Sequence, residues 1–150
     1  MLNHLLVPLD QSPLAEQALD YARDIIAPCG KLTLLTVLDN LVIYRYGHEI
    51  HFPKDVEDKM IAEAEHYLMA LGDDLHREGF STELLVRVGT PEQLIRRVAR
   101  SRDVDAIVMS THGRGGLGRL IFGSVTHTVL EKSPYPVMVV PNQDKTPAHN

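Results

Sequence analysis

The 150-residue sequence has little of several features that mark particular classes of protein. It contains one cysteine, Cys29, which excludes an internal disulfide and suits a reducing compartment. No apolar run approaches the roughly 18 residues that a membrane span needs. The N-terminus lacks the basic start of a secretory signal peptide. We therefore expect a cytoplasmic protein that does not associate with membranes.

The sequence also lacks an excess of positive charge. Its formal net charge is -5, and a general nucleic-acid binder needs a basic surface to neutralise phosphates, so that class is not expected. Hydrophobic residues make up 44% and charged residues 23%, which is ordinary for a globular protein. The length fits one domain with a substantial core. We place this domain at residues 1–142 and expect residues 143–150 to form a flexible tail.

Apolar runs alternate with amphipathic helical patterns along the chain. Strands are predicted at residues 5–9, 31–38, 82–88, 106–109 and 136–140. Helices are predicted from Pro13 to Ile26, from 54 to 76, from Pro91 through Val98, and from 124 to 132. This alternation predicts an α/β fold, a five-stranded, mainly parallel sheet with helices on both faces, of the Rossmann-like type. The connection from 39 to 53 has no assigned structure.

Two helix starts carry local signals. Ser12 precedes Pro13 and can cap the first predicted helix. Thr90 and Gln93 have the spacing of a capping box, in which each residue satisfies the backbone of the other.

Four segments end at the same edge of the predicted sheet. Asp10, Val37, Gly89 and Ser110 lie at or near the carboxyl ends of the first four strands. Open parallel sheets bind ligands outside these ends, where the strand order reverses. A ligand crevice is therefore predicted there.

The most informative segment follows the fourth predicted strand. Residues 110–126 read STHGRGGLGRLIFGSVT and lead directly into a predicted helix. Glycines let backbone N–H groups approach an anion closely, and a helix N-terminus adds unsatisfied donors and a positive dipole end. We interpret the segment as the phosphate cradle of a nucleotide site. Arg114 and Arg119 would offset phosphate charge or are ordinary surface arginines, and His112 would touch a phosphate or stabilise the turn.

Neither of the common nucleotide-binding motifs fits this loop. Residues 113–118 match G-x-G-x-x-G literally, but the dinucleotide fingerprint belongs to a first strand and helix. The phosphate-loop motif requires lysine and a hydroxyl residue where Arg119 and Leu120 stand.

A different pattern is present. Ser110-Thr111-His112-Gly113, nine intervening residues and then Gly123-Ser124-Val125-Thr126 resemble the nucleotide-binding branch of the universal stress protein family. The resemblance extends over the whole chain, from Leu6-Val7-Pro8-Leu9-Asp10 to Ser133-Pro134-Tyr135-Pro136-Val137. It implies the adenine nucleotide alpha hydrolase-like fold. One departure is Ser110, which stands where the family pattern has its first glycine.

The resemblance also implies roles for individual residues. Asp10 would lie near the ribose or a magnesium ion, although it could instead cap the first helix. Val37 would present its backbone to the adenine edge, and the hydroxyls of Ser124 and Thr126 would add donors to the phosphates. The full predicted nucleotide site consists of Pro8, Leu9, Asp10, Val37, Met109, Ser110, His112, Gly113, Arg114, Arg119, Gly123, Ser124, Val125 and Thr126.

Three functions are compatible with this site. The first is an ATP-binding regulatory module whose nucleotide, ATP or else ADP or AMP, is held with Mg²⁺ and influences an unknown protein partner. The second is a slow ATPase or phosphotransferase, but the loop has no lysine and no evident base. The third is a dimeric scaffold that has lost nucleotide binding because of Ser110. Strand 136–140 is short, apolar and last in order, so it could pair across a two-fold axis, and the resemblance implies such a homodimer.

Overall fold

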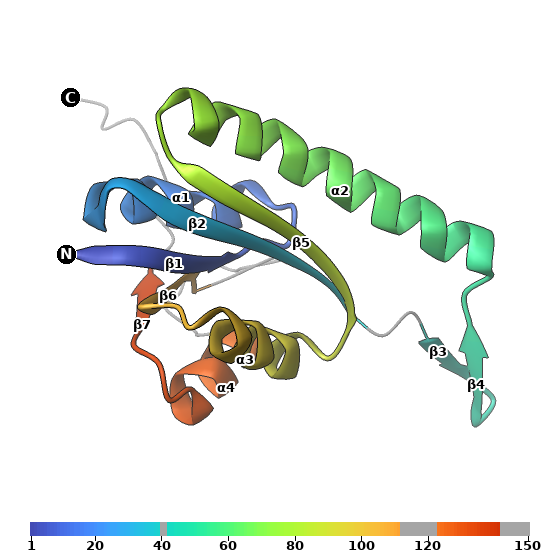
Figure 1. The fold of residues 1–150 in the computed structure, drawn as a ribbon. Coiled ribbons are helices and arrows are strands. Elements are labelled where there is room, and N and C mark those ends of the chain that lie inside the picture. The colour runs from blue at the N-terminus through green and yellow to red at the C-terminus, as the bar shows by residue number, and fades with distance from the viewer. Residues whose placement is uncertain (40–41, 112–122, 142–150) are drawn as a thin grey trace, which may run out of the picture.

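A computed structural model describes residues 1–39, 42–111 and 123–141 of the chain (Figure 1). The predicted tail therefore lies outside the described residues. The helices and strands are β1 (Leu2–Pro8), α1 (Pro13–Ile25), β2 (Ile26–Asp39), β3 (Val42–Arg45), β4 (His48–His51), α2 (Lys54–Arg77), β5 (Ser81–Gly89), α3 (Pro91–Arg102), β6 (Ala106–Ser110), α4 (Ser124–Lys132) and β7 (Val137–Val140).

Five strands form one parallel sheet in the order β5-β2-β1-β6-β7. This confirms the predicted five-stranded α/β architecture. The strand order reverses at β1, because β2 and β5 follow on one side and β6 and β7 on the other. The last strand, β7, stands at one edge of this sheet.

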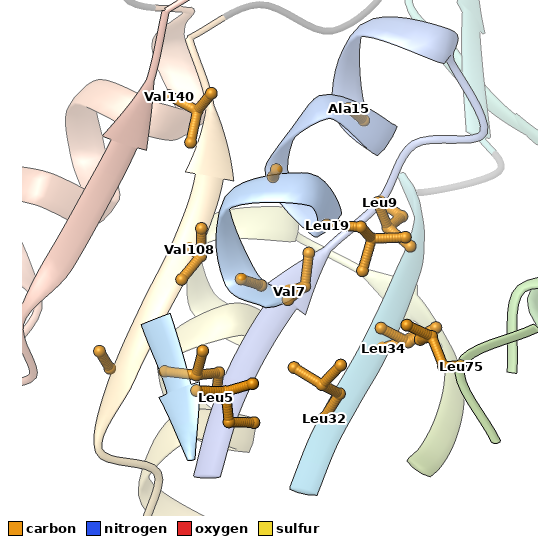
Figure 2. Packing of buried hydrophobic residues seen from close by; sticks show 14 of the residues in the cluster. Leu5, Val7, Leu9, Ala15, Leu19, Leu32, Leu34, Leu75, Val108 and Val140 are labelled. Atoms are coloured by element: carbon orange, nitrogen blue, oxygen red, sulfur yellow. The ribbon is translucent and has the colours of Figure 1, made fainter. Parts of the chain in front are cut away.

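Each face of the sheet is covered by two helices. One cluster of buried side chains packs α1 and α2 against the sheet, with Leu19 and Leu75 contributed by the helices and Leu5 and Leu34 by the strands (Figure 2). The second cluster packs α3 and α4 against the opposite face around Leu35 and other buried residues. Alternate residues of a strand point to opposite faces, so neighbours such as Leu34 and Leu35 belong to different clusters.

Strand β2 begins earlier than the sequence predicts. It starts at Ile26, which pairs with Leu2, and Pro28 and Gly30 lie inside it. The register with β1 shifts between Leu2 and His4, so extra residues of β2 bulge out of the ladder. A bulge accepts proline and glycine, which otherwise mark the end of an element.

The two predicted helix caps have different outcomes. Ser12 caps α1, since its side chain accepts a hydrogen bond from the backbone N–H of Ala15. The predicted capping box of α3 is wrong, because Thr90 makes no side-chain cap hydrogen bond. Pro91 at the first helical position has a preset φ and no N–H to satisfy, so this helix can begin without the cap.

The unassigned connection between β2 and α2 contains an antiparallel hairpin, β3–β4. Tyr46 and Gly47 form its turn with φ of 54° and 78°, the pair of positive values that a type I′ turn requires. The hairpin lies apart from the five-stranded sheet, near the start of α2 (Figure 1). Tyr44 and Tyr46 are exposed on it.

In the described part of the chain, no helix is long and apolar enough to cross a membrane.

A histidine lies in the sheet near its amino ends. The imidazole Nε2 of His4 is 2.8 Å from the hydroxyl of Thr33. Burial lowers the pKa of His4 and the positive charge of Lys31 lowers it further, which outweighs the opposing effects of Glu83 and Asp105. The folded protein therefore binds a proton at His4 less tightly than the unfolded chain does.

This difference predicts a loss of stability on mild acidification. The unfolded histidine takes up a proton near pH 6.5 and the folded one only at lower pH, so acid favours unfolding in that interval. The free energy of unfolding, measured by urea denaturation, should be lower at about pH 5.5 than at about pH 7.5. The decrease should be smaller in a His4→Gln variant. An equal fall in both proteins would contradict the role of His4.

Candidate functional site

The sheet opens where its strand order reverses. Strands β1 and β6 pair only through Leu5–Ala106 and Leu6–Ile107, whereas β1 pairs with β2 as far as Pro8–Leu35. Beyond Leu6, β1 and β6 therefore separate toward their carboxyl ends. This is the crevice in which open α/β sheets bind ligands.

A pocket of about 670 Å³ occupies this crevice. Its walls come from the ends of β1, β2 and β6, from the start of α1, from α2 and α3, and from the start of α4. Ten residues of the sequence-predicted site line it together: Pro8, Leu9, Asp10, Val37, Met109, Ser110, Gly123, Ser124, Val125 and Thr126. The other four, His112, Gly113, Arg114 and Arg119, lie outside the described residues.

The end of β2 presents backbone groups to the pocket. The N–H of Leu9 donates to the carbonyl of Leu35 at 2.8 Å, so the backbone groups of Leu35 face β1. Directions alternate along a strand, and the N–H and C=O of Val37 therefore face the same side, two residues further along. Strand β1 has already ended beside Val37, because its last pair with β2 is Pro8–Leu35. The backbone N–H and C=O of Val37 are therefore directed into the crevice.

Asp10 stands in the turn between β1 and α1. Its Oδ1 accepts hydrogen bonds from the backbone N–H of Ser12 at 3.0 Å and from the hydroxyl of Ser12 at 2.5 Å. Ser12 in turn caps α1 through Ala15. Gln11 between them has φ of 68°, a left-handed conformation that a side chain other than glycine adopts only at a cost. Asp10 thus braces the helix cap and also lines the pocket.

The start of α4 is one part of the phosphate cradle that the sequence predicts at residues 110–126, and residues 112–122 of that segment lie outside the described residues. Gly123 precedes this helix, and its N–H donates to the carbonyl of Thr111 at 2.8 Å. Helix geometry leaves the N–H groups of Ser124, Val125 and Thr126 without intrahelical acceptors. These donors and the positive end of the helix dipole lie at the pocket wall, which is an arrangement that attracts anions.

One expected donor is already engaged. The hydroxyl of Thr126 donates to the carbonyl of Ser110 at 3.0 Å, and the residue is buried. A hydroxyl has a single proton, so donation from Thr126 to a phosphate would require this hydrogen bond to break and stays a prediction. The bond ties α4 to the end of β6. Ser124 is exposed. Donation from its hydroxyl to a phosphate stays a prediction.

Several pocket residues were not predicted from the sequence. They are Gln11, Ala15, Leu35, Thr36, Leu38, Asp39, Met60, Pro91 and Ile95. Most flank residues that were predicted, and the same strand-end argument could have included them. Met60 is different, because no pattern in the sequence indicates that the long helix α2 reaches this crevice.

Two buried hydroxyls in this region lack a hydrogen-bond partner among the described residues. They are those of Thr36, in the pocket wall, and Thr111, at the end of β6. Within the same described ranges, no group of three or more His, Cys, Asp or Glu side chains could hold a metal ion. A resident all-protein metal centre is therefore not found there.

The fold and the pocket at its switch point define an α/β protein with a ligand crevice at the carboxyl ends of its strands. A model of the universal stress protein family matches residues 1–141. The chain belongs to the universal stress protein family.

Individual relatives agree with this assignment. Universal stress protein MJ0577 of Methanocaldococcus jannaschii is 29% identical over 154 residues, covering 93% of this chain and 95% of the relative. The solved structure of MJ0577 superposes with a TM-score of 0.81 at 27% identity, covering 96% of this chain and 99% of the other. An Arabidopsis thaliana family member, solved with AMP bound, has a TM-score of 0.68 at 20% identity and covers 98% and 97% of the two chains.

Proposed function

We propose that this protein binds an adenine nucleotide in the crevice and acts as a nucleotide-dependent regulatory module. The observation that carries the proposal is that three features meet around one pocket. They are the start of α4, which attracts anions, the carboxylate of Asp10, and the backbone of Val37 at the end of β2. Two structural neighbours support the class of ligand: the Arabidopsis protein was solved with AMP and another universal stress protein in complex with cAMP. The cAMP complex has a TM-score of 0.59 at 22% identity.

From the order of the strands we propose a place for each part of the nucleotide. The start of α4, beside the end of β6, would hold the phosphates through the first-turn N–H groups. Asp10 follows β1, the central strand, and would accept hydrogen bonds from the ribose hydroxyls. The outward-facing backbone of Val37 on β2 would pair with the base. Phosphate, sugar and base would thus lie across β6, β1 and β2 in turn.

The residues present also fit a magnesium ion brought in with ATP. Protein sites usually hold Mg²⁺ through one or two carboxylates together with substrate phosphates, so a dedicated ligand cluster is not required. Asp10 lines the pocket and offers a carboxylate. A bound ion would neutralise phosphate charge beside the start of α4, while Asp10 keeps Ser12 in place.

Binding without rapid turnover is the better-supported function. The titratable side chains among the described pocket residues are Asp10 and Asp39. Phosphoryl transfer requires strong charge neutralisation and a positioned water or acceptor, and the sequence of residues 110–126 offers no lysine and no evident base. We expect little phosphate release from ATP; steady release at saturating ATP that disappears in an Asp10→Ala variant would favour the enzyme instead. A cytoplasmic location, a homodimer through β7 and a protein partner stay predictions.

The proposed role of Asp10 in nucleotide binding can be separated by experiment from its role in supporting the cap of α1. Asp10→Ala should lower ATP affinity about tenfold or more, from loss of charge-assisted bonds, and should lower stability by about 1 kcal/mol, because Ser12 loses its brace. Asp10→Asn keeps an acceptor for Ser12, so it should preserve stability and lose affinity mainly when Mg²⁺ is present. Calorimetric titration and urea denaturation measure the two effects.

Ser12→Ala is the matched control for this experiment. It removes the cap of α1 and leaves the Asp10 carboxylate in place, so it should lose stability and keep affinity. If Asp10→Ala behaves like Ser12→Ala in both measurements, Asp10 only supports the helix.

A further inference from the structure

Thr36 places an unsatisfied hydroxyl in the pocket wall. The residue lies near the end of β2 and is 1% exposed, and its Oγ1 has no hydrogen-bond partner among the described residues. Leaving a buried polar group unpaired costs about 1–3 kcal/mol. An unpaired buried hydroxyl in the wall of a pocket indicates that a partner is missing.

The other buried threonine of the same strand is satisfied. Thr33 is fully buried, and its hydroxyl lies 2.8 Å from the His4 imidazole. The positions two residues before and after Thr36, on its own face of the sheet, are Leu34 and Leu38. A valine at position 36 would match these apolar neighbours and would leave no polar atom unpaired. Packing alone therefore does not account for the hydroxyl of Thr36.

The side chain is the part of Thr36 that can serve the pocket. Since the backbone groups of Leu35 and Val37 are directed toward the β1 side, those of Thr36 are directed toward β5. There the ladder continues, with Thr36 opposite Val86. The backbone of Thr36 is thus occupied within the sheet, which leaves its buried side chain as the part that can interact with a ligand in the pocket that this residue lines.

We propose that the Thr36 hydroxyl is a specificity-determining contact for the polar edge of the bound base, beside the backbone of Val37. The inference rests on the proposed nucleotide function. It concerns the base because Thr36 lies on β2, whereas β1 separates β2 from the phosphate-holding end of β6. A hydroxyl both donates and accepts, so it can pair with the amino group or a ring nitrogen of adenine.

The test replaces Thr36 with valine, which has nearly the same shape and lacks the hydroxyl. Affinity for AMP should fall about tenfold, as expected for loss of one hydrogen bond to a buried polar edge. Affinity for ribose 5-phosphate, which lacks the base, should not change. The unliganded variant should be at least as stable as the wild type, because an unpaired hydroxyl has been removed. Thr36→Ser should restore AMP affinity.

Thr33→Val is the matched control, with the same substitution on the same strand but away from the pocket. It removes a paired hydroxyl, so it should lower stability and leave AMP affinity unchanged. Binding of AMP to the wild type is measured first, and its absence would reject the proposed function itself. With wild-type binding established, unchanged AMP affinity in Thr36→Val, or equal losses for AMP and ribose 5-phosphate, would overturn the role of Thr36. A destabilised unliganded Thr36→Val would also overturn it, by showing that the hydroxyl is already paired.

Discussion

Replacing Gly123 with valine is expected to abolish nucleotide binding at ordinary ligand concentrations, with a loss of about 100-fold or more. A Cβ at Gly123 would meet the carbonyl oxygen of Thr111 at 3.3 Å, closer than an ordinary van der Waals contact. The branched methyl groups of valine would in addition stand at the pocket wall where a phosphate must approach the first-turn N–H groups of α4. Calorimetric titration with ATP and with AMP measures the loss.

The fold should survive this substitution. Gly123 has φ of -55°, which any residue can adopt, so the strain is limited to the contact with Thr111 and should cost about 1 kcal/mol. Gly123→Ala is the matched control, because it adds the same Cβ without the branch and should retain part of the affinity. Normal binding by a folded Gly123→Val variant would show that the phosphates do not approach the start of α4.

A proline at position 139 is expected to convert a homodimer into monomers. The carbonyl of Pro136 accepts a hydrogen bond from Ile107 of β6 at 2.9 Å, and that of Val140 accepts one at 3.0 Å from Thr111, which directly follows β6. Alternation therefore directs the backbone groups of Val137 and Val139 away from β6. These outward groups are available for pairing with a second copy of β7. Proline on an edge strand removes only the outward N–H, and Val139→Pro should therefore interrupt intermolecular pairing while leaving the β6–β7 ladder intact.

Light scattering at micromolar concentration checks this expectation. The wild type should have twice the mass of the chain, Val139→Pro the mass of one chain, and both should give the same circular dichroism spectrum. Val139→Thr keeps the N–H and a β-branched side chain, so it should stay dimeric. A monomeric wild type, or a dimer that tolerates the proline, would reject assembly through β7.

The regular elements could be predicted because their burial repeats at the period of a helix or strand. α1 and α2 agree with prediction to within a residue at each end, since Ala15, Ala18, Leu19 and Ala22 give α1 a continuous apolar stripe. The β3–β4 hairpin could not be predicted, because its turn places Tyr46 at a positive φ where Asn or Asp is the usual signal. The bulged start of β2 was missed for a similar reason: Pro28 and Gly30 are typical of turns.

The pocket could be predicted in part, because parallel strands bring their carboxyl ends to one edge. That rule placed Asp10, Val37 and Ser110 together without any knowledge of tertiary contacts. The contribution of Met60 depends on how α2 crosses the sheet, which no local pattern encodes. Nor does a sequence show that the Thr126 hydroxyl is bonded to Ser110 while that of Thr36 is left unpaired.

Calorimetric titration of the wild-type protein with ATP in the presence of magnesium, after removal of any nucleotide carried through purification, tests the central claim most directly. We expect one site per chain with micromolar or tighter affinity, and AMP should compete for it. No binding of any adenine nucleotide would contradict the claim and would leave the crevice without the ligand to which its strand ends and helix start are suited.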